Sequence, residues 1–188
     1  MSLTTLAHIK AFKNLSTDEH DQELLRLQGT AESALARLCN RTFEQATVTE
    51  YHSPFPGQAR LLLKRPPLVS ITSVHDDPVR VYGADTLVAA TAYAIEDEGA
   101  GILMFDGHAL NGGLRSVKVV YIGGFSPVPP DLAQAAIELI WLTRDLGDKA
   151  LLGVAARQIA DGSITTYQRN RLDAVRELID RYRLMRIA

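Results

Sequence analysis

The sequence has little of what disulfide-rich, membrane-spanning or nucleic-acid-wrapping proteins are built from. It contains one cysteine in 188 residues, which excludes an intramolecular disulfide and a cysteine-rich zinc module. The formal net charge is −2, so no general positive field points to nucleic acid or to an anionic membrane. No apolar run approaches the roughly 20 residues that span a bilayer, and residues 1–13 lack the apolar stretch of a signal peptide. We therefore expect a soluble protein without a membrane partner, made in a reducing compartment.

Signatures of catalytic and cofactor sites are also missing. The sequence has no phosphate-binding loop, no nucleophile elbow and no His-Glu-x-x-His pair. Gly99-Ala100-Gly101 lacks the third glycine of a dinucleotide site and is typical of a hairpin turn. His75-Asp76-Asp77 and Asp106-Gly107-His108 hold potential metal ligands, but both are expected where strands end and aspartate favours turns. Cys39 lies on the apolar side of a predicted helix, which favours core packing over reactivity. We expect no enzyme activity, cofactor or metal.

The spacing of hydrophobic residues divides the chain into three regions. Residues 4–41 show helical spacing, residues 43–125 alternate with period two between turn-forming segments, and residues 129–186 are again helical. We predict helices at about 5–12, 17–41, 130–146 and 167–184, the second begun by a Ser16–Glu19 capping box, with a loop at 148–166. Short strands with many turns indicate antiparallel pairing. The predicted fold is α+β: a bundle of about four helices with an inserted antiparallel β-region, in a single domain over residues 1–188.

The last predicted helix carries more arginine than acidic residues and no lysine. Arginine is suited to bidentate pairing at protein interfaces. A solvated helix face with favourable i,i+4 pairs is the other interpretation. The arginines that we assign to an interface as a hypothesis are Arg169, Arg176 and Arg183.

The order of several motifs resembles that of a known family. An R-P-P-L-V-S-I-T-S-V segment (Arg65 to Val74) precedes a Y-A-I strand (Tyr93 to Ile95), and V-V-Y-I-G-G-F-S-P-V-P-P-D-L-A-Q-A (Val119 to Ala135) follows. Over nearly the whole chain this order resembles the head–tail connector proteins of tailed bacteriophages and gene-transfer particles, also called adaptor or head-completion proteins. Gly123-Gly124 is expected to leave the sheet through positive φ values, which β-branched residues avoid.

The resemblance implies a structural virion protein at the head–tail junction, made in the host bacterial cytoplasm. It implies a ring of about a dozen subunits beneath the portal that joins capsid to tail and extends the DNA channel. The implied partners are copies of the chain itself, which can be monomeric when free, the portal, a downstream head-completion or tail protein, and the double-stranded DNA in the channel. It carries over no catalytic, cofactor-binding or metal-binding residues.

Two other classes of function stay open. One is a tail-associated binding module whose β-region recognises a protein or glycan through aromatic rings clustered on one groove: Tyr51, Phe55 and Tyr82. The other is an enzyme, which would need carboxylates converging on one of three histidines: His52, His75 or His108. Their spacing gives no reason to expect such a pocket.

The predicted loop at 148–166 is long for a connection inside a compact domain, where roughly four to six residues are usual. It contains apolar residues, Leu151 and Leu152 among them, that an isolated subunit would expose. A segment that is ordered on a neighbour would bury them. We therefore predict that Leu151, Leu152 and Arg157 contact an adjacent subunit or the portal.

Overall fold

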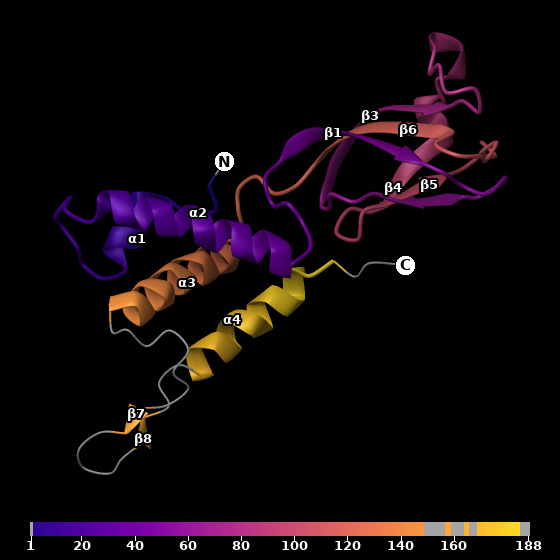
Figure 1. Cartoon of the computed structure of the whole chain (residues 1–188). Coiled ribbons are helices and arrows are strands. Elements are labelled where there is room, and N and C mark those ends of the chain that lie inside the picture. Colours follow the sequence, from indigo (N-terminus) through magenta and orange to yellow (C-terminus); the bar gives the residue numbers. More distant parts are fainter. Residues whose placement is uncertain (1, 149–156, 159–163, 166–168, 185–188) are drawn as a thin grey trace. The chain divides into compact units, whose positions relative to one another are not determined.

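The computed structural model describes residues 2–148, 157–158, 164–165 and 169–184 (Figure 1). The chain divides into two compact units, which we call the helical unit (residues 1–41 and 128–188) and the β unit (residues 42–127). The α+β prediction, with the β-region inserted between helices, is confirmed. That the two units act as a single domain stays a prediction. Within the described residues, no helix is both long enough and apolar enough to cross a membrane.

The helical unit holds the helices and one short strand pair. Its elements are α1 (Leu6–Ala11), α2 (Asp21–Leu38), α3 (Pro130–Asp148), β7 (Arg157–Gln158), β8 (Ile164–Thr165) and α4 (Arg169–Tyr182). Apolar stripes of α1, α2 and α3 form one core cluster: Ile9, Leu24, Leu27, Ala31, Ile137, Ile140 and Trp141. The indole N–H of Trp141 donates to the Ile9 carbonyl at 3.1 Å, so the largest side chain of the core has its polar atom satisfied.

Helix α4 is fixed by polar contacts as well as by buried Val175 and Ile179. The Tyr182 hydroxyl donates to Asp131 Oδ1 at 2.6 Å. Burial, followed by this hydrogen bond to a carboxylate, raises the pKa of Tyr182 to about 12. Cys39 is fully buried, as predicted, with its Sγ 3.7 Å from the Ile179 carbonyl. The end of α4 is thereby held to the start of α3 and the end of α2.

Two boundaries of the helical unit differ from the prediction. Helix α2 begins at Asp21 rather than at about residue 17, and no Ser16–Glu19 capping box starts it. The Asp18 carboxylate instead accepts a hydrogen bond from the Lys10 amine at 2.7 Å. The predicted loop at 148–166 contains the antiparallel pair β7–β8. Two-residue strands are too short to show an alternating pattern, and the remainder of that segment, with Leu151 and Leu152, lies outside the described residues.

The β unit consists of two three-stranded antiparallel sheets, as the alternating pattern predicted. One sheet has the order β1 (Ala46–His52), β6 (Val117–Gly123), β3 (Leu68–Asp76). The other has the order β2 (Arg60–Leu62), β5 (Ile102–Phe105), β4 (Tyr93–Asp97), with short 3₁₀ turns η1 (Ala84–Thr86) and η2 (Ala90–Ala92) before β4. Both sheets bury side chains in one core cluster: Leu61, Leu63, Leu68, Val74, Val88, Leu103, Phe105, Leu110, Val117, Val119 and Tyr121.

The central strand β6 ends in a glycine pair that the structure requires for two different reasons. Gly124 has φ +109°, a conformation that side chains rarely adopt, and a Cβ there would meet the backbone of Glu44. Gly123 is not in the positive-φ region, contrary to the prediction. Its lack of a side chain is needed because a Cβ would meet the Arg65 carbonyl.

Gly124→Ala is expected to lower the free energy of unfolding by about 2 kcal/mol, because alanine cannot relax at positive φ and the backbone of Glu44 cannot retreat. Urea denaturation followed by circular dichroism measures this. The matched control is Gly29→Ala in α2, where an added methyl group meets open space. It should raise stability by roughly 0.5–1 kcal/mol. Equal effects of the two variants would contradict the assignment.

Candidate interaction surfaces

Three loops leave the sheet β1–β6–β3 at the same end. His52 at the end of β1 and Asp76 at the end of β3 both pair with Val117 at the start of β6. The segments that follow or precede these residues are therefore neighbours. We call residues 51–57, 77–83 and 113–118 the loop end of the β unit. The loops are joined by hydrogen bonds from Arg115 N to Ser53 Oγ at 2.8 Å and from Asp77 N to Ser116 O at 2.7 Å.

The Asp77 carboxylate organises the loop at residues 77–83. Its Oδ1 accepts from Val79 N at 2.8 Å, and its Oδ2 accepts from the backbone N–H groups of Val81 and Tyr82, each at 2.7 Å. The hydrogen bond from Tyr82, joined by those from Val79 and Val81, holds the pKa of Asp77 below its usual range, although burial acts in the opposite direction. Asp77 is thus a turn former whose charge is directed at the backbone.

Two tyrosines meet at the loop end with two cations above them. The rings of Tyr51 and Tyr82 are 5.4 Å apart between centroids. The Arg115 guanidinium lies 4.5 Å from the Tyr51 centroid, and the Lys118 ammonium lies 5.6 Å from that of Tyr82. The Tyr82 hydroxyl donates to the Arg115 carbonyl at 2.6 Å. Cation–π contacts hold both cations against the rings, and the hydrogen bond holds the Arg115 backbone beside Tyr82.

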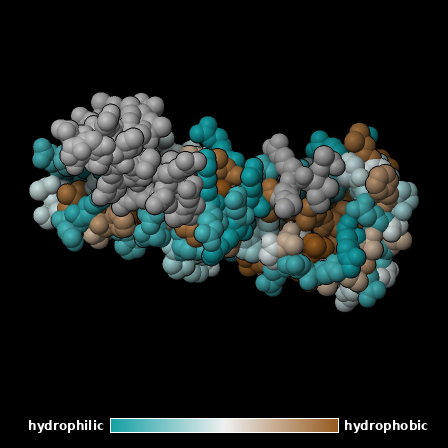
Figure 2. Space-filling model, turned by 90° about the horizontal axis from the view of Figure 1, so that it is seen from below, coloured by the Kyte–Doolittle hydropathy of each residue, from teal (hydrophilic) through white to brown (hydrophobic). Residues whose placement is uncertain are grey.

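The loop end also exposes apolar side chains. Figure 2 shows hydrophobic residues at the surface on the side of the picture where the β unit lies. Among the large hydrophobic residues that the structure describes, the four most exposed all belong to the loop end: Phe55 (80%), Val81 (76%), Val79 (75%) and Leu114 (71%). Concentrations of exposed apolar side chains are typical of protein contact sites.

The sequence-based aromatic hypothesis identified part of this surface. It named Tyr51, Phe55 and Tyr82, and the structure brings the two tyrosine rings together with Phe55 at the same end of the sheet. It missed Val79, Val81 and the basic residues. The available signal was the Pro-Val-Arg-Val-Tyr run at residues 78–82, in which β-branched residues stand inside a turn-forming segment.

Of the potential metal ligands, for which the sequence predicts no metal site, Asp76 and His108 form a pair. His108 Nε2 lies 3.0 Å from Asp76 Oδ2, which also accepts from the backbone and side-chain nitrogens of Asn111 at 2.9 and 3.0 Å. His75 instead has its Nδ1 3.2 Å from the Gly83 carbonyl. Searched over the described residues, the structure contains no group of three His, Cys, Asp or Glu side chains that could hold a metal ion. The Asp76–His108 pair joins the loop after β5 to the end of β3.

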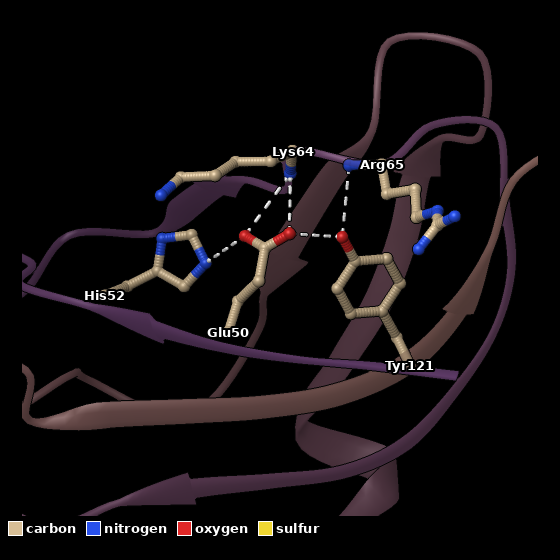
Figure 3. A network of polar contacts seen from close by, with 5 residues as sticks. All are labelled: Glu50, His52, Lys64, Arg65 and Tyr121. Carbon is tan, nitrogen blue, oxygen red and sulfur yellow. Dashed lines mark hydrogen bonds and ion pairs between the residues drawn. The ribbon is translucent and has the colours of Figure 1, made fainter. Parts of the chain in front are cut away.

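A second polar network lies inside the β unit (Figure 3). The Glu50 carboxylate of β1 accepts from the Tyr121 hydroxyl of β6 and from the backbone N–H of Lys64, at 3.0 and 3.3 Å to its two oxygens. The Tyr121 hydroxyl in turn accepts from Arg65 N at 3.1 Å. His52 Nε2 lies 3.2 Å from Glu50 Oε2. The network binds the chain that leaves β2 to the sheet β1–β6–β3.

The protonation of this network follows from its contacts. Burial of the Glu50 carboxyl raises its pKa, but the contacts with His52, Tyr121 and Lys64 prevail and the pKa lies below its usual range. Burial, followed by the neighbouring Glu50 carboxylate, holds the pKa of Tyr121 far above its usual range. A carboxylate and a neutral phenol are therefore the stable pair. Since Glu50, Tyr121 and the backbone of Lys64 and Arg65 bond to one another within the fold, the network is a structural brace.

The interface residues predicted from the sequence are only partly described. Leu151 and Leu152 lie outside the described residues, Arg157 is in β7, and Arg169 begins α4. Arg176 and Arg183 are exposed on α4. Arg183 Nη1 lies 3.9 Å from Asp180 Oδ1, and on the same helix Arg181 pairs with Glu177 at 3.1 Å. These pairs fit a solvated helix face, and the interface role of α4 stays a prediction.

The fold and these surfaces can now be compared with known protein families. The described polar clusters brace the fold, and the most exposed large apolar side chains of the described residues lie on loops that also carry basic residues, a composition typical of protein contact sites. The model of the family described as "Head completion protein" matches residues 2–184. The chain belongs to the head completion protein family, which confirms the resemblance inferred from its motifs.

Solved structures share the fold. A chain in the "Neck of empty GTA particle computed with C6 symmetry" is 19% identical with a TM-score of 0.62, over 99% of this chain and 92% of that chain. A chain in the "Virion of native gene transfer agent (GTA) particle" is 20% identical with a TM-score of 0.61, over the same shares. A third, in the "Neck of native GTA particle computed with C12 symmetry", is 20% identical with a TM-score of 0.57, over 97% and 90%. No curated protein matches the sequence.

Tyr121→Phe is expected to lower the free energy of unfolding by about 1–3 kcal/mol, because Glu50 and Arg65 N lose a partner in the interior. The lowered pKa of Glu50 means that this contribution is complete above its unfolded pKa near 4.5. The loss relative to the wild type should therefore shrink as the pH falls through the folded pKa. Urea denaturation at a series of pH values measures it. Tyr51→Phe, which removes a hydroxyl from an exposed ring, should change stability by less than about 0.5 kcal/mol; an equal loss would contradict the role of Tyr121.

Asp77→Ala is expected to leave the β unit folded and to loosen residues 78–82, because three backbone N–H groups lose their acceptor. Hydrogen–deuterium exchange should show lost protection at Val79, Val81 and Tyr82. In the wild type the same protection should persist above the usual pKa of aspartate and fall as the pH drops through the lowered pKa of Asp77. Asp106→Ala, at another exposed turn of the β unit, should leave these amides protected. Unchanged exchange in Asp77→Ala would refute the capping role.

Proposed function

We propose that this chain is a structural virion protein of the neck of a phage-like or gene-transfer particle. In this proposal it forms a ring beneath the portal, joins the capsid to the tail and extends the DNA channel. The observation that carries the proposal is the family match over residues 2–184, supported by a fold shared over nearly the full chain with proteins of particle necks. No enzymatic step belongs to this function.

A closed ring requires two different contact faces on each subunit, one for each neighbour. Necks computed with C6 and C12 symmetry repeat their subunits around an axis, and such rings are closed by heterologous interfaces between neighbouring copies. The proposed partners are copies of the chain, the portal, a downstream head-completion or tail protein, and double-stranded DNA passing through the channel. The proposed contact residues on the helical unit are Leu151, Leu152, Arg157, Arg169, Arg176 and Arg183.

The alternative role, a tail-associated module that recognises a protein or glycan, is supported by one observation. The rings of Tyr51 and Tyr82 meet at an exposed end of the β unit. Recognition of a partner by the loop end is compatible with a place in a ring, because the two functions use different parts of the chain.

The proposal predicts that purified particles contain about a dozen copies of this chain per particle. Quantitative mass spectrometry against a labelled standard measures the copy number, and electron microscopy of particles from a deletion strain shows whether capsids lack tails. Capsids without tails, restored by the plasmid-borne chain, are the expected result. One or two copies per particle, or normal tails without the chain, would refute it.

A further inference from the structure

We propose that the loop end of the β unit is a docking surface for a different protein of the same particle. The partner's contact surface should combine apolar side chains with Asp and Glu carboxylates. This inference rests on the proposed function for the presence of the chain in the particle. The chemistry of the partner is argued from the loop end itself.

The apolar part of the surface projects from the loops rather than from the sheet. Phe55, Val79, Val81 and Leu114 come from three separate segments, yet the register of β1, β3 and β6 brings these segments to one end. Each side chain is more than 70% exposed. Burying apolar area of this kind against another protein is favourable by roughly 25 cal/mol for each Å² removed from water.

The charged part of the surface is positive. Arg80 and Arg115 are exposed at the loop end, and Lys118 is partly exposed beside them. The carboxylates nearby are directed inward: Asp77 accepts three backbone N–H groups, and Asp76 is buried against His108 and Asn111. Asp85 in η1 is the exposed acidic residue nearest in sequence. An acidic partner surface therefore complements the loop end.

The backbone of the loop end is held in unusual conformations. Of the non-glycine residues with positive φ in the described chain, two are asparagines, which tolerate it, and the other three lie at the loop end: Arg80 (69°), Tyr82 (55°) and Arg115 (54°). Each costs of order 1 kcal/mol or more and persists because the Asp77 and Tyr82 hydrogen bonds impose it. A surface ordered in advance loses less entropy on binding.

Other occupants fit these features less well. Protein–DNA contacts are mostly hydrogen bonds to phosphate and sugar, which would leave four exposed apolar side chains unmatched. A second copy of this chain would have to offer an acidic, apolar patch. One such candidate among the described residues of the β unit is Asp97 and Glu98 near exposed Leu62, but Lys64 is exposed on the same segment as Leu62 and Glu96 is paired with Arg60. That patch has mixed charge, so a different protein is the better complement.

The test places a photo-cross-linker at the loop end in assembled particles. Val81→p-benzoylphenylalanine is expressed in the deletion strain, the particles are irradiated, and cross-linked peptides are identified by mass spectrometry. The expected adduct joins Val81 to a peptide of another particle protein that contains Asp or Glu beside apolar residues. The control is Val69→p-benzoylphenylalanine, a valine that is 51% exposed at the start of β3 and should not give this adduct.

Charge reversal tests the electrostatic part. Arg80→Glu, combined with the cross-linker at Val81, should reduce the yield of the adduct at least tenfold, since like charges then face each other. Arg26→Glu, an exposed arginine of α2, should leave the yield unchanged, and Arg80→Lys should retain most of it. Circular dichroism of each purified variant confirms that it is folded.

Each remaining outcome overturns the inference. An adduct with the same chain identifies a second copy as the occupant, an adduct with DNA identifies nucleic acid, and an adduct yield unaffected by Arg80→Glu excludes an acidic partner. Absence of any adduct from particles that contain the chain at normal copy number refutes the docking surface while leaving the proposed function intact. Absence of the chain from wild-type particles refutes the proposed function, and this inference with it.

Discussion

The hydrogen bond between the Tyr121 hydroxyl and the Glu50 carboxylate is the centre of the polar network that ties the two sheets of the β unit together. The sheet β2–β5–β4 is built from strands of three, four and five residues, which cannot form a stable unit without a partner. Apolar packing against the other sheet supplies most of the stabilisation. The Glu50 network sets how the two sheets are connected, because it fixes the backbone after β2 at Lys64 and Arg65 against β1 and β6. The buried Glu50 carboxylate is tolerated because the Tyr121 hydroxyl and the Lys64 backbone N–H donate to it.

A rigid β unit gives its loops their defined form. The strand register brings residues 53–57, 77–83 and 113–116 to one end, and the Asp77 carboxylate imposes a single conformation on the longest of them. The tilted pair of Tyr51 and Tyr82 rings then contacts Arg115 and Lys118. Apolar side chains that would destabilise a free-standing loop can therefore stay exposed without collapsing onto one another.

The two polar clusters give buried ionisable residues of this chain a structural role. Glu50 with Tyr121, and Asp76 with His108, each join segments that are distant in the sequence. Glu50 accepts from Tyr121 and from Lys64 N, and Asp76 Oδ2 accepts from Asn111, while His52 and His108 contact one carboxylate each. Such clusters hold distant segments of the chain in fixed positions. They are consistent with membership of the head completion protein family, whose match spans residues 2–184.

The sequence by itself determined the fold class, the positions of the long helices and the inserted antiparallel β-region, because hydrophobic period is a local property of the chain. It also determined the family, through motifs whose order is readable without coordinates. Short elements such as β7 and β8 were not predicted, since two residues are too few to show a hydrophobic period. The start of α2 was predicted too early. Asp18 binds Lys10 of α1 and does not cap α2. Only the tertiary structure decided that Tyr51, Tyr82, Arg115 and the exposed valines form one surface. Their proximity depends on how β1 and β3 pair with β6, and strand register is a long-range property that no local pattern contains.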